Sequence, residues 1–154
     1  MPQLKIFRDD LTGKQIANFL HEHLAHMNEI MPPESVHALD LAALRSPEIT
    51  FWSVCEGSEL LGCGALKELD PHCGEIKSMR SAKTHRGRGI GSMMLEHIIQ
   101  VAKGRGYRCL NLDTEAMAEF GPARRLYQRY GFEYQGPFAD YVDDPNSMFM
   151  IKML

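Results

Sequence analysis

The sequence has no apolar run that approaches the roughly 20 residues of a membrane-spanning helix, so we expect no transmembrane segment. Its first ten residues include several charged side chains and lack the apolar stretch and small-residue cleavage site of a secretory signal. The cysteines, Cys55, Cys63, Cys73 and Cys109, form no CxxC pair and no pattern typical of a disulfide framework. Isolated cysteines of this kind are most often buried thiols in a reducing compartment, and we therefore expect a cytoplasmic protein.

A strong charge of one sign is also absent, because 17 lysines and arginines face 20 aspartates and glutamates, for a net charge of −3. This mild negative balance argues against a nucleic-acid-binding protein, whose domains are usually strongly basic. The chain has 154 residues, of which 44% are hydrophobic, and this composition excludes a disordered or collagen-like chain. The length predicts a single domain covering residues 1–154.

The hydrophobic pattern changes repeatedly between strand and helix periodicity. The predicted strands are 4–8, 50–55, 60–69, 75–81, 109–114, 132–135 and 147–154, and the predicted helices are 13–27, 35–45, 90–102 and 122–130. Tight turns at 56–59 and 70–74 link three consecutive strands into an antiparallel meander. This order predicts a mixed α/β domain built around one sheet.

The most informative segment is a glycine-rich turn, His85–Ser92, which lies between a predicted strand and a predicted helix. Glycines let the backbone approach a ligand closely, and the amide groups and dipole at a helix start attract anions. From Lys77 to Arg88 the chain carries five basic residues and no acidic one. Together these features predict a site for a phosphate or pyrophosphate group.

Three phosphate-binding motifs compete for this turn. A Walker A loop is excluded because no Gly-Lys-Ser/Thr sequence occurs. The dinucleotide fingerprint GxGxxG is met by Gly87 and Gly89, with Asp113 about 20 residues further on, but a serine stands at its third glycine position. The pattern R-x-x-G-x-G is met in full by Arg86, Gly89 and Gly91.

This last pattern, with Met79–Ser81 before it and Ala123–Phe132 after it, resembles the GCN5-related N-acetyltransferase (GNAT) family. The resemblance extends over nearly the whole chain, and the sequence looks like a bacterial subgroup of small N-acetyltransferases. It implies an α/β, GNAT-like fold with one central, mostly antiparallel, splayed sheet flanked by helices. It also implies an acyltransferase that moves an acetyl group from acetyl-CoA to a primary amine of a small molecule or amino-acid-like substrate.

The resemblance further implies which residues act. Backbone groups of the strand end and the turn would hold acetyl-CoA. The implied acetyl-CoA-binding residues are Met79, Arg80, Ser81, Arg86, Gly87, Arg88, Gly89, Ile90, Gly91 and Ser92. Tyr127 matches the tyrosine that many relatives use to protonate the leaving thiolate, although it also fits the apolar face of its helix as a packing residue. Glu75 is the candidate for removing the proton of the amine, although a solvated charge at a strand end fits it equally well.

The remaining polar patterns are less specific. Three histidines, His21, His23 and His26, do not converge on one face of the first helix, so we expect no metal site. Residues 133–150 contain four acidic residues and no basic one, which either favours a cationic substrate or marks a solvated loop. The resemblance implies a homodimer, and we expect neither nucleic acid nor a membrane as partner.

Two other functions remain open from the residues. A non-catalytic CoA-binding regulatory module would share the glycine-rich turn, so only turnover separates it from an enzyme. A dinucleotide-binding domain would bind NAD in preference to CoA.

Overall fold

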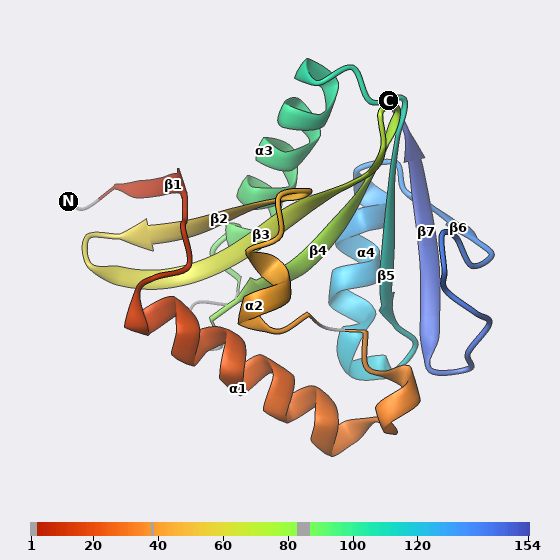
Figure 1. The fold of residues 1–154 in the computed structure, drawn as a ribbon, viewed down its shortest axis with the longest axis horizontal. Helices are drawn as coiled ribbons and strands as arrows, with labels where there is room; N and C mark the ends of the chain where they lie inside the picture. Colours follow the sequence, from red (N-terminus) through yellow and green to blue (C-terminus); the bar gives the residue numbers. More distant parts are fainter. Residues whose placement is uncertain (1–2, 38, 83–86) are drawn as a thin grey trace.

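The computed structural model describes residues 3–37, 39–82 and 87–154 (Figure 1). The strands are β1 (Leu4–Arg8), β2 (Ile49–Glu56), β3 (Glu59–Asp70), β4 (Cys73–Ser81), β5 (Cys109–Glu115), β6 (Glu133–Gln135) and β7 (Ser147–Met153). The α-helices are α1 (Lys14–Ile30), α2 (Leu41–Leu44), α3 (Ile90–Gly104) and α4 (Gly121–Arg129), and the 3₁₀ turns are η1 (Pro33–Ser35) and η3 (Ala118–Phe120). This order confirms the predicted succession of elements.

The seven strands form one sheet in the order β1-β2-β3-β4-β5-β7-β6. Strands β2, β3 and β4 form the predicted antiparallel meander, and only the β4–β5 pair is parallel among the described strands. The parallel pair exists because α3 crosses over between its two strands. The sheet is therefore mixed and mostly antiparallel, as the sequence predicts.

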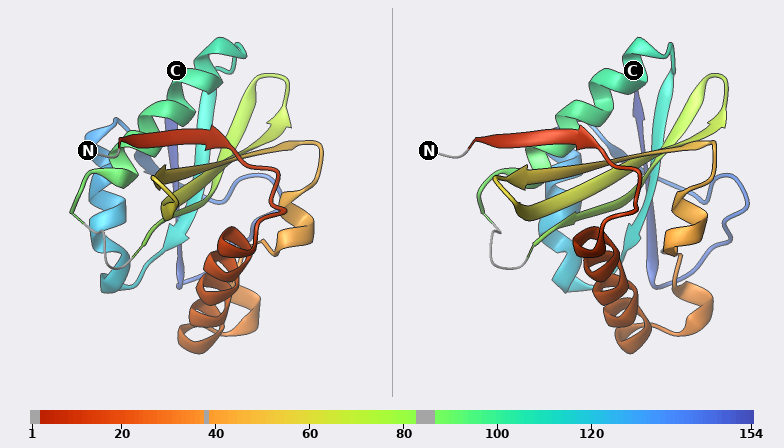
Figure 2. Two further views of the ribbon diagram at one scale, coloured as in Figure 1. Left: turned by 90° about the vertical axis from the view of Figure 1, so that its left-hand side faces the viewer. Right: turned by 60° about the vertical axis from the view of Figure 1, so that its left-hand side comes forward.

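Helices cover both faces of the sheet, so the centre of the sheet is buried on both sides (Figure 2). On strand β2, Trp52 belongs to the core cluster that contains α3 and Tyr127 of α4, whereas Phe51 belongs to the cluster that contains α1 and α2. Helix α3 lies close to β3, since a Cβ atom added at Gly64 would come within 2.7 Å of Met94 Cγ. Within the described residues, no helix combines the length and apolar character needed to cross a membrane.

The segment between α1 and β2 differs from the predicted helix 35–45. Among the described residues of this segment, the α-helix covers Leu41–Leu44, and its N-cap Asp40 accepts a hydrogen bond from the backbone amide of Ala43 at 2.8 Å. Before it, Pro32 and Pro33 hold a 3₁₀ turn. Helical periodicity alone did not distinguish these two short pieces from one helix.

Strands β4 and β5 separate after a short parallel ladder (Figure 1). The last paired residues are Ile76 and Leu112, after which β4 continues on β3 alone and β5 continues on β7 alone. A β-bulge accompanies the separation, because Ala65 pairs with Lys77 but Cys63 pairs with Arg80. Within this bulge Ser78 has a φ of 54°, a left-handed conformation that is uncommon for residues other than glycine. The bulge lies where the gap between β4 and β5 begins.

The other end of the same ladder is closed covalently. Cys73 and Cys109 lie directly opposite each other and form a disulfide, with their Cα atoms 5.0 Å apart. This corrects the expectation that all the cysteines are thiols, which holds only for Cys55 and Cys63. The two bonded cysteines are 36 residues apart in the chain, and the register of the parallel strands brings them together.

Replacing Ser78 by valine tests the strain at the bulge. A β-branched side chain is disfavoured at positive φ, so we expect Ser78→Val to lower the free energy of unfolding by about 1–2 kcal/mol. Ser78→Gly should be close to the wild type, because relief of strain offsets the extra flexibility of the unfolded chain. Urea denaturation measures both variants. A valine variant as stable as the glycine variant would contradict a left-handed residue at this position.

Candidate functional site

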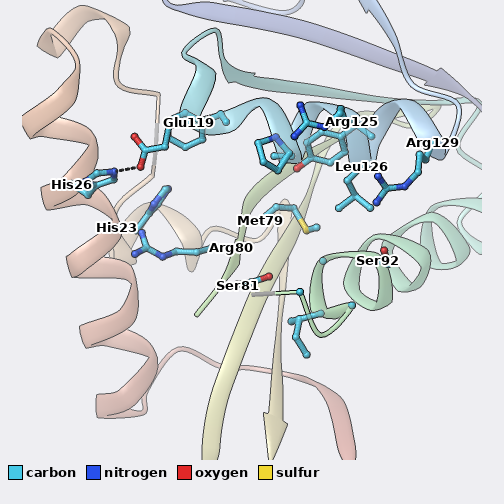
Figure 3. A pocket seen from close by; sticks show the side chains of 18 residues that line it. His23, His26, Met79, Arg80, Ser81, Ser92, Glu119, Arg125, Leu126 and Arg129 are labelled. Carbon is cyan, nitrogen blue, oxygen red and sulfur yellow. Dashed lines mark hydrogen bonds and ion pairs between the residues drawn. The ribbon is translucent and has the colours of Figure 1, made fainter. Parts of the chain in front are cut away.

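A pocket of about 530 Å³ lies where the separated end of β4 meets the start of α3, helix α4 and helix α1 (Figure 3). We call it the large pocket. Most of the predicted acetyl-CoA-binding residues line it: Met79, Arg80, Ser81, Gly87, Gly89, Ile90, Gly91 and Ser92. Arg88 is not among the lining residues, and its guanidinium pairs with the Glu56 carboxylate at 2.8 Å. Arg86 lies outside the described residues.

The glycine-rich turn leads directly into α3. In the described part of the chain, no side chain caps the N-terminus of this helix by a hydrogen bond. Gly87 and Gly89 have φ values of 85° and 78°, which only glycine adopts at little cost. Gly89 is the N-cap of α3, and its carbonyl accepts the first helical hydrogen bond, from the amide of Met93. The amides of the three intervening residues therefore lack helical acceptors and form, with the helix dipole, a site suited to an anion.

Arginines supply further positive charge to the large pocket. Arg80 lines it from β4, and Arg125 and Arg129 line it from α4, whereas Glu119 is an acidic lining residue (Figure 3). Arg125 and Arg129 are four residues apart and so share one face of their helix. Their spacing was visible in the sequence, but nothing local indicated that this face borders a pocket.

A second, smaller pocket of about 100 Å³ adjoins the first one. It lies at the gap between β4 and β5, with Ile76 and Lys77 on one side and Asp113, Thr114 and Glu115 on the other. The residues that line both pockets are His23, Met79, Phe120, Ala123 and Tyr127. The two pockets therefore meet at the point where the strands separate.

Tyr127 lies at this junction and is only 6% exposed. Its ring packs edge-on against Phe132, with the ring centroids 5.6 Å apart. Burial raises the pKa of Tyr127 above its ordinary value, and the nearby charge of Glu115 raises it further. The side chain is therefore both a core aromatic and a protonated hydroxyl at the wall of both pockets.

Glu75 is buried, not solvated, with only 2% of its surface exposed. Its Oε2 accepts hydrogen bonds from the Tyr141 hydroxyl at 2.5 Å and from Lys77 Nζ at 3.1 Å. Lys77 also donates to the Tyr141 hydroxyl at 2.7 Å. Lys77 lines the small pocket, whereas Glu75 lines neither pocket. Its predicted part in catalysis stays a prediction.

Sequence reasoning missed the polar groups that line the small pocket. His37 Nδ1 lies 2.7 Å from Asp113 Oδ2, and Glu115 follows two residues later on β5. Burial raises the pKa of Glu115 from 4.5 to about 7. A signal was present, because Asn111, Asp113 and Glu115 alternate with Leu112 and Thr114 on β5, a strand inside the sheet.

Two of the α1 histidines, His23 and His26, line the large pocket. His26 Nε2 lies 3.0 Å from Glu119 Oε1 and so links α1 to η3, as the dashed line in Figure 3 shows. His23 lines both pockets. Among the residues that the structure describes, no cluster of three or more potential metal ligands occurs.

The chain is similar to several known proteins. A family model described as the acetyltransferase (GNAT) family matches residues 11–132. The chain is 58% identical over 146 residues to YsnE of Bacillus subtilis, an uncharacterized N-acetyltransferase, with 95% of this chain and 97% of the relative covered. It is 47% identical over 142 residues to YedL of Escherichia coli, an uncharacterized N-acetyltransferase, with 92% and 89% covered.

A solved structure shows the same fold. A GNAT family acetyltransferase from Elizabethkingia anophelis, with acetyl-CoA bound, aligns with a TM-score of 0.71 over 98% of each chain, at 20% identity. Similarity at this level of identity concerns the fold alone.

The burial of His23 generates a prediction for stability against pH. Burial, with smaller contributions from the charges of Arg80 and His26, lowers the pKa of His23 from 6.5 to about 4. Between these two pKa values, His23 is protonated in the unfolded chain but neutral in the folded chain. The free energy of unfolding therefore falls as the pH drops from about 6.5 towards 4. Between neutral pH and pH 5 the loss from this one group is about 2 kcal/mol.

The variant His23→Gln removes this titrating group and should lose correspondingly less stability over the same interval. Urea denaturation of both proteins at neutral pH and at about pH 5 measures the difference. Equal losses in the wild type and the variant would show that His23 titrates normally.

Proposed function

The chain belongs to the acetyltransferase (GNAT) family, and we propose that it transfers the acetyl group of acetyl-CoA to a primary amine of a small molecule or amino-acid-like substrate. The observation that carries the proposal is the junction of two pockets at the separated strands. The large pocket has the size, the arginines and the amide-rich helix start that a CoA molecule requires. The small pocket has room for the reacting end of a small acceptor.

The donor would lie along the edge of β4. Beyond Ile76, this strand has no partner on its β5 side within the described chain, so its backbone groups there can bond to another extended chain. The pantetheine arm of CoA carries amides that can pair with Met79 and Ser81 in this way. Its pyrophosphate would then reach the amides of the turn from Gly87 to Ser92, with Arg125 and Arg129 nearby.

The thioester would lie at the junction beside Tyr127. The Tyr127 hydroxyl is protonated near neutral pH, as its raised pKa also requires, and its place at the junction would let it donate a proton to the departing thiolate. Asp113 and Glu115 give the small pocket two carboxyl groups, and the one lysine of its lining, Lys77, is paired with Glu75, so the pocket favours an acceptor that carries a positive charge. An acceptor amine is such a group before it loses its proton. These charges support an amine acceptor over an anionic one.

Replacing Gly91 by leucine tests the donor site. A Cβ atom at this position would already lie 3.0 Å from Leu126 Cδ2, and the larger side chain would extend into the large pocket. We expect CoA binding to weaken at least about tenfold, a loss of 1.4 kcal/mol or more. Gly104→Leu is the matched control, because a Cβ atom there meets nothing within 4 Å. Thermal melts with and without CoA measure the change; equal protection of the two variants would place the donor elsewhere.

A turnover assay tests the reaction itself. Release of free thiol from acetyl-CoA across a panel of primary amines should identify an acceptor, and Tyr127→Phe should lower kcat on the order of 10²-fold with little change in CoA affinity. The phenylalanine keeps the ring packed against Phe132, so folding should be preserved. If none of the amines causes thiol release, a non-catalytic CoA-binding module is favoured. Full turnover by the phenylalanine variant would assign Tyr127 to packing.

A further inference from the structure

A histidine and an aspartate form a tight pair on the wall of the small pocket. His37, between η1 and α2, places Nδ1 2.7 Å from Oδ2 of Asp113, and both side chains line the pocket. They are 21% and 10% exposed, so the pair is largely shielded from solvent without being sealed. The ring of Tyr141 packs against the His37 ring at 5.0 Å between centroids. The imidazole is thus held in orientation by both a hydrogen bond and a ring contact.

The hydrogen bond fixes which nitrogen of His37 carries the proton. An ionised carboxylate only accepts hydrogen bonds, so His37 Nδ1 is the donor and Nε2 of the neutral ring keeps its lone pair. Burial raises the pKa of Asp113 above its ordinary value, and the charge of Glu75 adds to this, whereas the hydrogen bond from His37 and the charges of His37 and Lys77 partly offset the increase. The other carboxylate oxygen, Oδ1, is buried without a hydrogen-bond partner among the described residues. The hydrogen bond with His37 is therefore the side-chain hydrogen bond that this carboxylate makes in the described part of the chain.

Two other candidates for accepting the proton, Glu75 and Lys77, are less suitably placed in the described part of the chain. A general base must reach the proton that it removes, either directly or through one water molecule. Glu75 lines neither pocket, and its Oε2 is engaged by Lys77 and Tyr141. Lys77 donates a hydrogen bond to this same carboxylate and so acts as a donor, not as an acceptor. His37 lines the same small pocket as Tyr127, as Glu115 and His23 also do. What distinguishes His37 is its hydrogen bond to Asp113, which orients the imidazole and leaves the lone pair of Nε2 available.

We propose that His37 Nε2 accepts the proton of the acceptor ammonium group, and that Asp113 is the positioning residue that holds the imidazole in the required tautomer. The inference rests on the proposed function, because it concerns the acceptor side of the same reaction. The imidazolium that forms would lie beside Asp113 and within the electrostatic influence of Glu115, and both interactions stabilise its charge.

The proton balance of the reaction is complete with these groups. The ammonium gives one proton to His37, and the neutral nitrogen attacks the thioester carbon, whose carbonyl electron pair moves to oxygen. The carbon–sulfur bond then breaks, and Tyr127 protonates the sulfur. The nitrogen gives its second proton to the tyrosinate, and His37 releases the first proton to solvent. The products are the acetamide, free CoA and one proton.

The tautomer is tested without any acceptor. Long-range ¹H–¹⁵N spectra of histidine-labelled protein above the pKa of the imidazole should show His37 protonated at Nδ1 and bare at Nε2, with His37→Gln assigning the signals. Asp113→Asn should abolish this preference, because a carboxamide can donate to the ring as well as accept from it. A proton on Nε2 in the wild type would overturn the proposal.

Turnover is tested with two amines of similar size, ethylamine and trifluoroethylamine. Near neutral pH ethylamine is almost wholly protonated, whereas its fluorinated analogue is mostly neutral and needs less help from a base. We expect His37→Gln to lower kcat/KM for ethylamine about 100-fold or more but to lower it much less for trifluoroethylamine. Asp113→Asn should show the same split. His72→Gln, on the exposed turn between β3 and β4, is the control and should match the wild type.

The two kinds of failure give different results. If the wild type acetylates ethylamine and His37→Gln does so at the same rate, the inference fails and the proposed function stands. An equal loss for both amines also overturns the inference, because it indicates damage to the pocket instead of a missing base. If the wild type acetylates neither of these amines nor any other amine of the panel, the proposed acceptor class fails, and the spectrum alone decides whether His37 holds the required tautomer.

Discussion

The separation of β4 from β5 is the constraint on which the rest of the site depends. A strand inside a sheet normally satisfies its backbone groups on both sides, yet β4 gives up one side after Ile76. The gap leaves backbone donors and acceptors facing a pocket and lets side chains from both faces of the sheet approach one point. Any ligand that bonds to this edge takes the place of the missing strand.

A structural feature marks each end of the β4–β5 ladder and so defines where the gap begins. At one end the disulfide between Cys73 and Cys109 joins paired residues directly. At the other end the bulge around Ser78 inserts an extra residue into β4 and turns the strand away. The ladder between them is short, so the strands are held together over only a few residues. This combination fixes where the gap begins and keeps it open without a partner strand.

Much of the fold could be predicted from the sequence because its signals are local. Helix periodicity and tight turns each depend on residues that are close together in the chain, and the predicted order of helices and strands was confirmed, although the predicted helix 35–45 was too long. Contacts between distant segments were not predictable: His37 and Asp113 are 76 residues apart, and only the fold brings them together. Burial was equally hidden for Glu75, because its partner Tyr141 comes from the C-terminal part of the chain. A charged side chain on a strand normally indicates a position exposed to solvent. Here Lys77 and Tyr141 donate the hydrogen bonds to Glu75 that water would otherwise supply.

The gap also explains why acid and base groups for one reaction come from opposite layers of the protein. Leu112 belongs to the core on the α3 and α4 side, so its neighbour Asp113 points to the other face of β5. Tyr127 belongs to the first layer, and His37 follows η1 in the layer of α1 and α2. In an unbroken sheet these two side chains would be separated by backbone. Because β4 and β5 have parted, both line one small pocket, where one can give a proton to the leaving group while the other takes one from the nucleophile.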